Sequence, residues 1–233
     1  MSTIRTTCSY CSVGCNFNAT IEDGKLVSFL PTKDYPVNLG KSCPKGFHLL
    51  KPFAAPDRAL HPLLRDKDGK MQELSWDAAT KEFAQRFKAI KEKHGPESVA
   101  FLSTGQMLME EMAFLGALFK FGMGFIHADG NTRQCMATAA VAYKQAFGFD
   151  APPFTYKDLE ESDLLVFVGA NPTIAHPVFW NRVKMNTKNA KIVVIDPRRT
   201  KTVEESDIHI AVKPKGDLDL LYAIAHVLIK TSG

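Results

Sequence analysis

The sequence has no long apolar run and no concentration of charge of one sign. Its most apolar stretch, residues 113–128, is interrupted by Lys120 and by three glycines, so it falls short of the continuous span of about 20 residues that a membrane helix needs. The 29 Lys and Arg residues exceed the 25 Asp and Glu residues by only four and are scattered along the chain, which gives no basis for nucleic-acid binding. Internal repeats and low-complexity tracts are absent as well. These absences predict a globular protein that binds neither a membrane nor a nucleic acid.

An export signal is also missing from the start of the sequence. The chain opens with Met1-Ser2-Thr3-Ile4-Arg5, and no apolar segment precedes Cys8, whereas a secretory signal contains one. This start predicts a cytoplasmic protein with reduced thiols. With 233 residues, of which 45% are hydrophobic and 23% charged, the chain can bury the core of one large domain, or of a small domain and a medium one.

Cysteine is scarce, and four of the five cysteines fall within the first 43 residues. Cys8, Cys11, Cys15 and Cys43 follow the spacing C-x2-C-x3-C-x27-C. A short loop holds the first three thiolates within the diameter of one cluster, and a returning segment brings the fourth. The pattern predicts a 4Fe-4S cluster. Structural zinc, which usually takes two C-x2-C pairs, and disulfides or inert thiols are the alternatives.

Turn residues and apolar periodicity predict a small β domain followed by an α/β domain. Residues 16–21 and 25–30 alternate apolar and polar side chains around Asp23-Gly24, as in a β-hairpin. Asp68-Gly69 marks a second hairpin. Prolines punctuate the segment between these hairpins, so we place the domain boundary near residue 55. The prediction is a cluster domain at residues 1–55 and an α/β domain at residues 56–233.

Helical and strand patterns alternate after the boundary. Ser75 is expected to cap a helix that ends at Gly95-Pro96. Further helices are expected at residues 108–121, 136–147, 176–185 and 218–230. Strands are expected at residues 98–102, where the segment has the character of a buried strand, and at residues 164–168, 191–195 and 208–212. Strands separated by helices imply a mostly parallel sheet with helices on both faces.

Two loops at the ends of expected strands are candidates for a ligand site, because open α/β sheets bind ligands at the carboxyl ends of their strands. Gly169-Ala170-Asn171-Pro172-Thr173-Ile174-Ala175-His176 joins a strand to a helix whose first amides could receive a phosphate. Asp196-Pro197-Arg198-Arg199-Thr200 offers a carboxylate for ribose or a guanine edge, and arginines for pyrophosphate. Taken alone, either segment could also be an ordinary exposed turn.

Two further residues have the chemistry of a metal or redox site. Cys135 lies in Asn131-Thr132-Arg133-Gln134-Cys135-Met136 at the start of an expected helix, where the helix dipole and Arg133 would favour a thiolate that binds a metal. A buried structural cysteine is the alternative. Lys45 follows Cys43 by two residues and must lie close to the cluster. An ordinary surface lysine is the alternative there.

Together these motifs resemble the amino-terminal part of the prokaryotic molybdopterin oxidoreductases, which carry a molybdenum bis(molybdopterin guanine dinucleotide) centre. The resemblance covers essentially the whole chain and follows the family order: the cysteine motif with Cys43-Pro44-Lys45-Gly46, then Glu73-Leu74-Ser75-Trp76-Asp77, then the loops at Gly169 and Asp196. Within the family the chain is most similar to the nitrate reductases, in Thr104-Gly105-Gln106, in residues 131–137, and in residues 169–176 with the Pro177-Val178 that follows.

The resemblance implies a role for each candidate residue. Cys135 would be the protein ligand to molybdenum, and Lys45 would relay electrons from the cluster to a pterin. The position of Arg133 near that metal, in a chain of net positive charge, suits the binding of an anionic substrate. The residues that would contact the pterin dinucleotides are Lys45, Gln106, Asn131, Gly169, Ala170, Asn171, His176, Asp196, Pro197, Arg198, Arg199, Thr200, Lys215, Gly216 and Asp217. The implied reaction is the reduction of nitrate to nitrite in nitrate assimilation, with electrons passing from the cluster to molybdenum while the cofactor breaks the bond.

The same resemblance implies partners and leaves alternatives open. The electron donor would be a ferredoxin, a flavodoxin or an NADH-oxidising flavoprotein subunit. Catalytic subunits of the family are much longer than 233 residues, which implies later domains or a second chain that completes the molybdenum site. A formate dehydrogenase of the same family is the nearest alternative, although a histidine usually follows its metal-binding residue and Met136 stands there in this chain. A non-catalytic iron-sulfur electron carrier is the alternative from another class.

Overall fold

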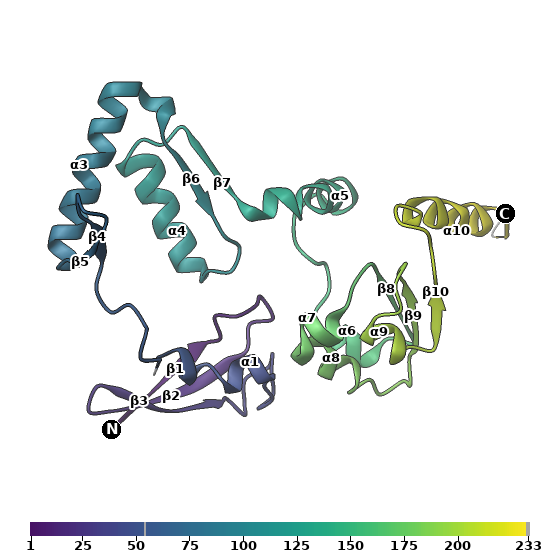
Figure 1. The fold of residues 1–233 in the computed structure, drawn as a ribbon. Coiled ribbons are helices and arrows are strands. Elements are labelled where there is room, and N and C mark those ends of the chain that lie inside the picture. Colours follow the sequence, from purple (N-terminus) through teal and green to yellow (C-terminus); the bar gives the residue numbers. More distant parts are fainter. Residues whose placement is uncertain (54, 232–233) are drawn as a thin grey trace. The chain divides into compact units, whose positions relative to one another are not determined.

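The chain folds into two compact units, and the sequence of the second is inserted within the sequence of the first. The computed structural model describes residues 1–53 and 55–231. The first unit combines residues 1–47 with residues 152–233, and the second comprises residues 48–151 (Figure 1). The boundary that the sequence predicts near residue 55, between a cluster domain and an α/β domain, stays a prediction. Within the described ranges, every helix is too short or too polar to cross a membrane.

An antiparallel sheet forms the N-terminal part of the first unit. Its strands, hydrogen-bonded in sequence order, are β1 (Ser2–Thr7), β2 (Asn16–Glu22) and β3 (Lys25–Pro31). The predicted hairpin is confirmed: Asp23 and Gly24 have φ angles of 48° and 74°, as a two-residue type I′ turn requires. Phe17 of β2 is completely buried and stacks on Phe29 of β3, with ring centroids 4.3 Å apart. This aromatic pair is the core of the sheet.

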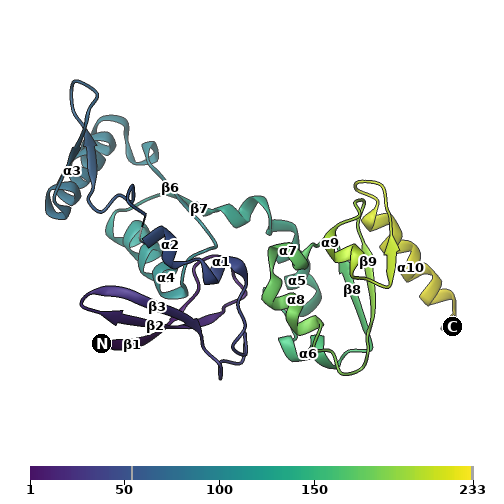
Figure 2. The same cartoon turned by 60° about the horizontal axis from the view of Figure 1, so that its bottom comes forward.

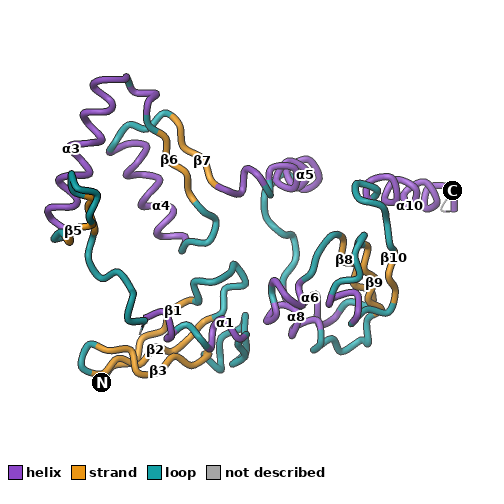
Figure 3. Tube along the Cα trace, in the orientation of Figure 1, coloured by secondary structure: helices purple, strands orange, loops and turns teal. Residues whose placement is uncertain are grey.

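The C-terminal part of the same unit is a parallel α/β layer. Its strands pair in the order β10-β9-β8, and both pairings are parallel (Figure 3). The strands predicted at residues 164–168 and 191–195 are confirmed, and the third strand is two residues shorter than predicted. The elements in chain order are α6 (Tyr156–Glu161), β8 (Leu164–Val168), α7 (Pro172–Ala175), α8 (Pro177–Val183), β9 (Lys191–Ile195), α9 (Lys201–Glu204), β10 (Ile208–Ile210) and α10 (Asp217–Thr231) (Figure 2).

One face of β8 carries the core of this layer. Leu165 packs against Trp180 and Val183 of α8 and against Leu159 of α6. Leu164, Val166 and Val168 point to the opposite face, because successive residues of a strand alternate, and they are between 41% and 55% exposed. Within this unit α6 and α8 therefore cover one face, whereas the sequence predicts helices on both faces.

The second unit holds a β-hairpin, a pair of parallel strands and three longer helices. The predicted hairpin at Asp68-Gly69 is confirmed, and so is the helix between Ser75 and Gly95. The Ser75 hydroxyl caps that helix by accepting a hydrogen bond from the Ala78 amide. The elements are α2 (Leu50–Phe53), β4 (Leu63–Arg65), β5 (Met71–Glu73), α3 (Trp76–His94), η1 (Pro96–Ser98), β6 (Ala100–Ser103), α4 (Met109–Ala117), η2 (Leu118–Gly122), β7 (His127–Gly130), η3 (Asn131–Gln134) and α5 (Ala137–Phe147).

The strand predicted at residues 98–102 is displaced and is not buried. The turn η1 takes up Pro96–Ser98, so β6 begins only at Ala100, and Leu102 is 81% exposed. β6 pairs in parallel with β7 and, among the described residues, with no strand of the first unit. The parallel strands therefore belong to two sheets, one in each unit, instead of the single sheet that the alternating pattern predicts.

The Glu205 carboxylate leads to a prediction about stability in acid. It pairs with Lys184 Nζ at 2.7 Å and accepts a hydrogen bond from Trp180 Nε1 at 2.8 Å. These contacts, Lys184 first, hold the pKa of Glu205 below its usual range. Because the folded-state pKa lies below the unfolded value of about 4.3, the stabilisation is complete above that value and is lost as the pH falls through the folded pKa.

Glu205→Gln should therefore make the free energy of unfolding depend less steeply on pH in acid. The measurement is urea unfolding followed by circular dichroism between about pH 3 and pH 6. Glu204→Gln is the matched control, since Glu204 pairs with Lys201 on the surface and its loss should leave the slope nearly unchanged. If the unfolding free energy of Glu205→Gln changed with pH as steeply as that of wild type, the prediction would be contradicted.

Candidate functional site

The four N-terminal cysteines line one enclosed cavity. β1 ends before Cys8 and β2 begins after Cys15, so the pairing of these strands closes the loop with the first three cysteines. The Cys8 amide donates to the Cys15 carbonyl across the neck of the loop at 2.8 Å. Cys43 precedes the short helix α1 (Pro44–Phe47). The wall of this cysteine cavity is formed by Cys8, Tyr10, Cys11, Val13, Cys15, Phe17, Ser42, Cys43, Gly46, Pro177 and Val178.

Most of the thiol groups around this cavity are buried. Cys8, Cys15 and Cys43 are buried, and Cys11 is half-buried. Burial raises the pKa of the Cys8 thiol and raises the pKa of Cys15 to about 12, so these thiols keep their protons until a metal displaces them. Four thiols around one cavity are the ligand set that a 4Fe-4S cluster takes.

The turn after Cys43 is held by close packing. Gly46 is buried, and a Cβ atom on it would lie 2.4 Å from Ser42 Oγ and 2.8 Å from Phe17 Cζ. Lys45 in the same turn is exposed. Its ammonium group contributes to the low pKa of His176, after the larger effect of burial, and also acts on Cys8. Lys45 therefore lies near both the cysteine cavity and the loop that ends at His176.

The two predicted strand-end loops lie side by side. Val168 of β8 is paired with Ile195 of β9, and the Gly169 amide donates to the Ile195 carbonyl at 2.9 Å. Gly169 has a φ of 58°, a value that glycine adopts without steric cost. The Asn171 side-chain oxygen accepts a hydrogen bond from the Thr202 hydroxyl at 2.8 Å. This bond ties the first loop to the helix that follows the second.

The second loop uses its polar side chains to shape the turn. Asp196 is 7% exposed, and its carboxylate accepts a hydrogen bond from the Arg198 amide at 2.7 Å. The Thr200 hydroxyl caps α9 by accepting from the Val203 amide at 3.3 Å. Pro197, Arg198 and Arg199 remain exposed at the edge of the sheet.

The third predicted segment, Lys215-Gly216-Asp217, follows β10 and leads into α10. Lys215 has a φ of 69°, and the Gly216 amide donates to the Lys213 carbonyl at 2.8 Å. All three predicted segments of this unit therefore follow strands of one parallel sheet, at its carboxyl edge.

A second cavity, of ≈ 320 Å³, adjoins the first loop. Ala170, Pro172 and His176 from the predicted loop form part of its wall. Val13 lines both this cavity and the cysteine cavity. The other lining residues, which the sequence did not single out, are Ser12, Val13, Tyr156, Phe167 and Phe179. We call this space the aromatic cavity; its rings and apolar walls suit a flat heterocycle beside the cysteines.

The remaining candidate residues belong to the second unit, where they follow β6 and β7. The Asn131 side-chain oxygen accepts a hydrogen bond from the Gly105 amide at 2.9 Å, which ties η3 to the loop that carries Gln106. Cys135 is exposed and lies just after η3. Arg133 Nε donates to the Asp129 carboxylate at 2.8 Å. The roles predicted for these residues stay predictions.

Comparison with known proteins places these features in a family. Residues 1–52 match the family described as the molybdopterin oxidoreductase Fe4S4 domain, and residues 58–232 match the family described as molybdopterin oxidoreductase. The chain belongs to the molybdopterin oxidoreductase family. Its small cysteine-bearing part and its parallel α/β part correspond to the iron-sulfur and molybdopterin domains of these proteins.

Several nitrate reductases are similar to this molybdopterin oxidoreductase chain. The nitrate reductase of Symbiobacterium thermophilum is 37% identical over 230 residues, which cover 97% of this chain and 30% of that protein. The periplasmic nitrate reductase of Desulfovibrio desulfuricans has the same identity and coverage. The nitrate reductase of Klebsiella oxytoca is 38% identical, over 97% of this chain and 26% of that protein.

A solved structure supports the fold. Acetylene hydratase from Pelobacter acetylenicus aligns with a TM-score of 0.80 and 24% sequence identity, over 98% of this chain and 32% of that one. The chain therefore spans about a third or less of the length of these proteins.

Gly46→Ala should disturb the cysteine cavity, because the added methyl group would press on Phe17, which lines it. Overpacking of this kind costs about 1–3 kcal/mol, and the variant should bind less iron per chain, measured by iron analysis after anaerobic purification. Gly116→Ala is the control, since a Cβ there meets nothing within 4 Å; it should keep the iron content of wild type. The same iron content in Gly46→Ala would show that the cavity tolerates the methyl group.

Proposed function

We propose that this chain is the amino-terminal, cofactor-holding part of a molybdenum-dependent nitrate reductase. The observation that carries the proposal is the meeting of the cysteine loop and the Gly169 loop around the aromatic cavity, which shares Val13 with the cysteine cavity. The names of the relatives that are 37–38% identical support nitrate as the substrate. The reaction takes nitrate, two electrons and two protons to nitrite and water.

In this proposal the first unit binds the cluster and one part of the pterin cofactor. The four cysteines hold the 4Fe-4S cluster, and Lys45 lies on the electron path from the cluster to the pterin. The strand-end loops bind a guanine dinucleotide: backbone amides and the two arginines meet its phosphates, and the Asp196 loop meets its nucleoside. When bound, the molybdenum bis(molybdopterin guanine dinucleotide) centre supplies two-electron oxygen-atom transfer.

The second unit contributes the residues proposed for molybdenum and substrate. Cys135 is the proposed protein ligand to molybdenum, and Gln106 and Asn131 are proposed to contact the pterin. Arg133 is proposed to attract nitrate; its bond to Asp129 engages only Nε, which leaves the two Nη groups for an anion. The side chain of Arg133 is 66% exposed, in keeping with access for a solute.

The proposal extends to partners and location. A ferredoxin, a flavodoxin or an NADH-oxidising flavoprotein subunit is the proposed electron donor, and later domains or a second chain would complete the molybdenum site. The cytoplasmic, assimilatory branch stays a prediction from the sequence, because the similar proteins include a periplasmic nitrate reductase.

Metal and substrate measurements on the anaerobically purified protein that contains this chain test the proposal. We expect about four iron atoms per chain, as one 4Fe-4S cluster requires, together with molybdenum, and oxidation of reduced viologen when nitrate is added. Iron without molybdenum would support a non-catalytic electron carrier instead. Activity with formate and none with nitrate would support a formate dehydrogenase.

Cys135→Ser and Cys43→Ser separate the two metal sites. Cys135→Ser should keep its iron and lose nitrate-dependent viologen oxidation by more than about 100-fold, since even the loss of a residue that only supports a metal ligand costs 10–100-fold. Cys43→Ser should lose iron. Wild-type nitrate reduction by Cys135→Ser would refute the role proposed for this thiol.

A further inference from the structure

Helix α8 contacts both the cysteine cavity and the aromatic cavity. Pro177 and Val178, at its start, line the cysteine cavity, and Phe179 lines the aromatic cavity. Val178 and Trp180 are only 2% and 3% exposed, so the helix is firmly embedded. One short helix thus connects the predicted cluster site, the adjoining cavity and the core of the α/β layer.

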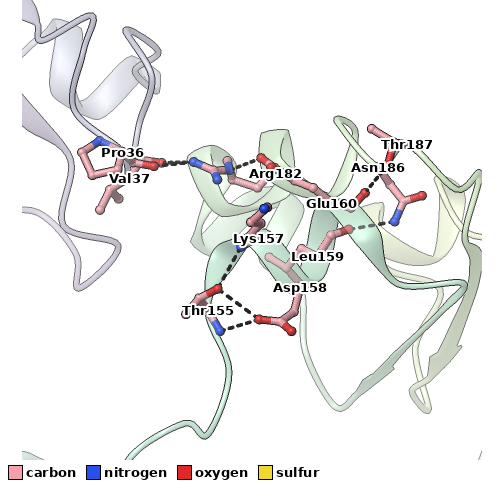
Figure 4. A network of polar contacts seen from close by, with 10 residues as sticks. All are labelled: Pro36, Val37, Thr155, Lys157, Asp158, Leu159, Glu160, Arg182, Asn186 and Thr187. Atoms are coloured by element: carbon pink, nitrogen blue, oxygen red, sulfur yellow. Dashed lines mark hydrogen bonds and ion pairs between the residues drawn. The ribbon is translucent and has the colours of Figure 1, made fainter.

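Arg182, near the end of α8, joins this helix to the loop after β3. Its Nη1 donates to the Pro36 carbonyl at 2.5 Å and to the Val37 carbonyl at 3.1 Å, as Figure 4 shows. Its Nε forms an ion pair with the Glu160 carboxylate of α6. The side chains of Arg182 and Glu160 are 9% and 18% exposed. Removing one partner of a charge pair this buried strongly destabilises a protein, so the ion pair holds Arg182 in place, and its bonds to Pro36 and Val37 connect the two parts of the unit.

The loop that Arg182 holds lies between the third and fourth cysteines. Its Asn38 is 1% exposed and donates to the Lys41 carbonyl at 3.0 Å. The Asn38 side chain also bonds the amide and the carbonyl of Asn16, at 2.9 Å and 3.2 Å. Asn16 directly follows the third cysteine, and Lys41 lies two residues before the fourth. A fixed position for this loop therefore fixes the backbone next to two of the four thiols.

Tyr156 makes a second contact with the cysteine loops. Its hydroxyl donates to the Val13 carbonyl at 2.9 Å, and Val13 lies midway between Cys11 and Cys15. The guanidinium carbon of Arg182 is 6.0 Å from the centre of the Tyr156 ring, so the two contacts are neighbours. Burial, followed by the nearby cysteine sulfurs, raises the pKa of Tyr156. The phenol therefore keeps its proton and remains a donor at neutral pH.

We propose that Tyr156 of α6 and Arg182 of α8 are positioning residues for the iron-sulfur cluster, which hold the two cysteine-bearing loops against these helices and thereby set the reduction potential of the cluster and its retention. We call their contacts with Val13, Pro36 and Val37 the latch. The inference rests on the cluster of the proposed function and not on molybdenum or nitrate.

The direction in which the reduction potential should change follows from the charge of the cluster. A cubane with four thiolate ligands gains one negative charge when it is reduced, and water stabilises the more highly charged form. Solvent exposure and hydrogen bonds to the sulfurs are among the factors that set cluster potentials. Cys11 is the half-buried cysteine, so a looser loop admits water on that side first. Loss of the latch contacts should therefore raise the reduction potential of the cluster and speed its loss of iron.

Tyr156→Phe tests the latch with the smallest change, because it removes only the hydroxyl. In anaerobically purified protein we expect the one-electron reduction equilibrium to shift about tenfold toward the reduced cluster, a potential about 59 mV more positive, measured by a redox titration followed by electron paramagnetic resonance. Iron transfer to a chelator should become several-fold faster. Tyr143→Phe, in the second unit, is the matched control and should leave both measurements unchanged.

Arg182→Gln should change both measurements in the same direction, and Arg182→Lys, which keeps the charge, should change them less. Arg86→Gln is the control, since Arg86 pairs with Glu82 on the surface of α3. If Arg182→Gln fails to fold, Tyr156→Phe decides. A potential and a rate of iron loss equal to wild type in Tyr156→Phe would overturn the proposal. Because neither measurement needs molybdenum or nitrate, the latch and the proposed function can fail independently.

Discussion

Four thiols have to surround one cavity, and this constraint determines how the first unit is assembled. Three thiols come from a loop that the pairing of β1 with β2 closes at its neck. The fourth comes from a turn where only a residue without a side chain fits against Phe17. The strands alone leave the cavity incomplete, since Pro177 and Val178 of α8 supply part of its wall. A segment more than 130 residues further along the chain therefore belongs to the same compact unit.

Local features of this arrangement are predictable from the sequence because short-range physics decides them. Asp23-Gly24 specifies a hairpin turn, Ser75 and Gly95 bound a helix, and the apolar runs at residues 164–168 and 191–195 form the strands expected of them. The cysteine spacing indicates a cluster for the same reason, because a short loop limits how far its thiols can separate. The strand-end loops are predictable from topology, since the carboxyl ends of parallel strands share one edge.

The contacts that join distant segments cannot be predicted from the sequence in this way. Tyr156 meets Val13 across 143 positions and Arg182 meets Pro36 across 146, and no periodicity or spacing marks either pair. Nothing in the alternation of helices and strands says that β6 and β7 form a sheet of their own. The buried Asn38 is similar: an asparagine in a loop suggests an exposed turn, yet its hydrogen bonds to Asn16 and Lys41 keep it inside.

The shared wall between the two cavities has a physical consequence for electron transfer. Val13 lines both cavities, so the two spaces adjoin at this residue. Lys45 acts electrostatically on both Cys8 and His176, and burial keeps the His176 imidazole neutral at physiological pH, since its pKa is lowered. In the function proposed above, Lys45 would be a positive charge beside the cluster and the pterin, and it would favour the reduced form of each. The cysteine-bearing loops are held from two sides in this unit, by the pairing of β1 with β2 and by the contacts of Tyr156 and Arg182.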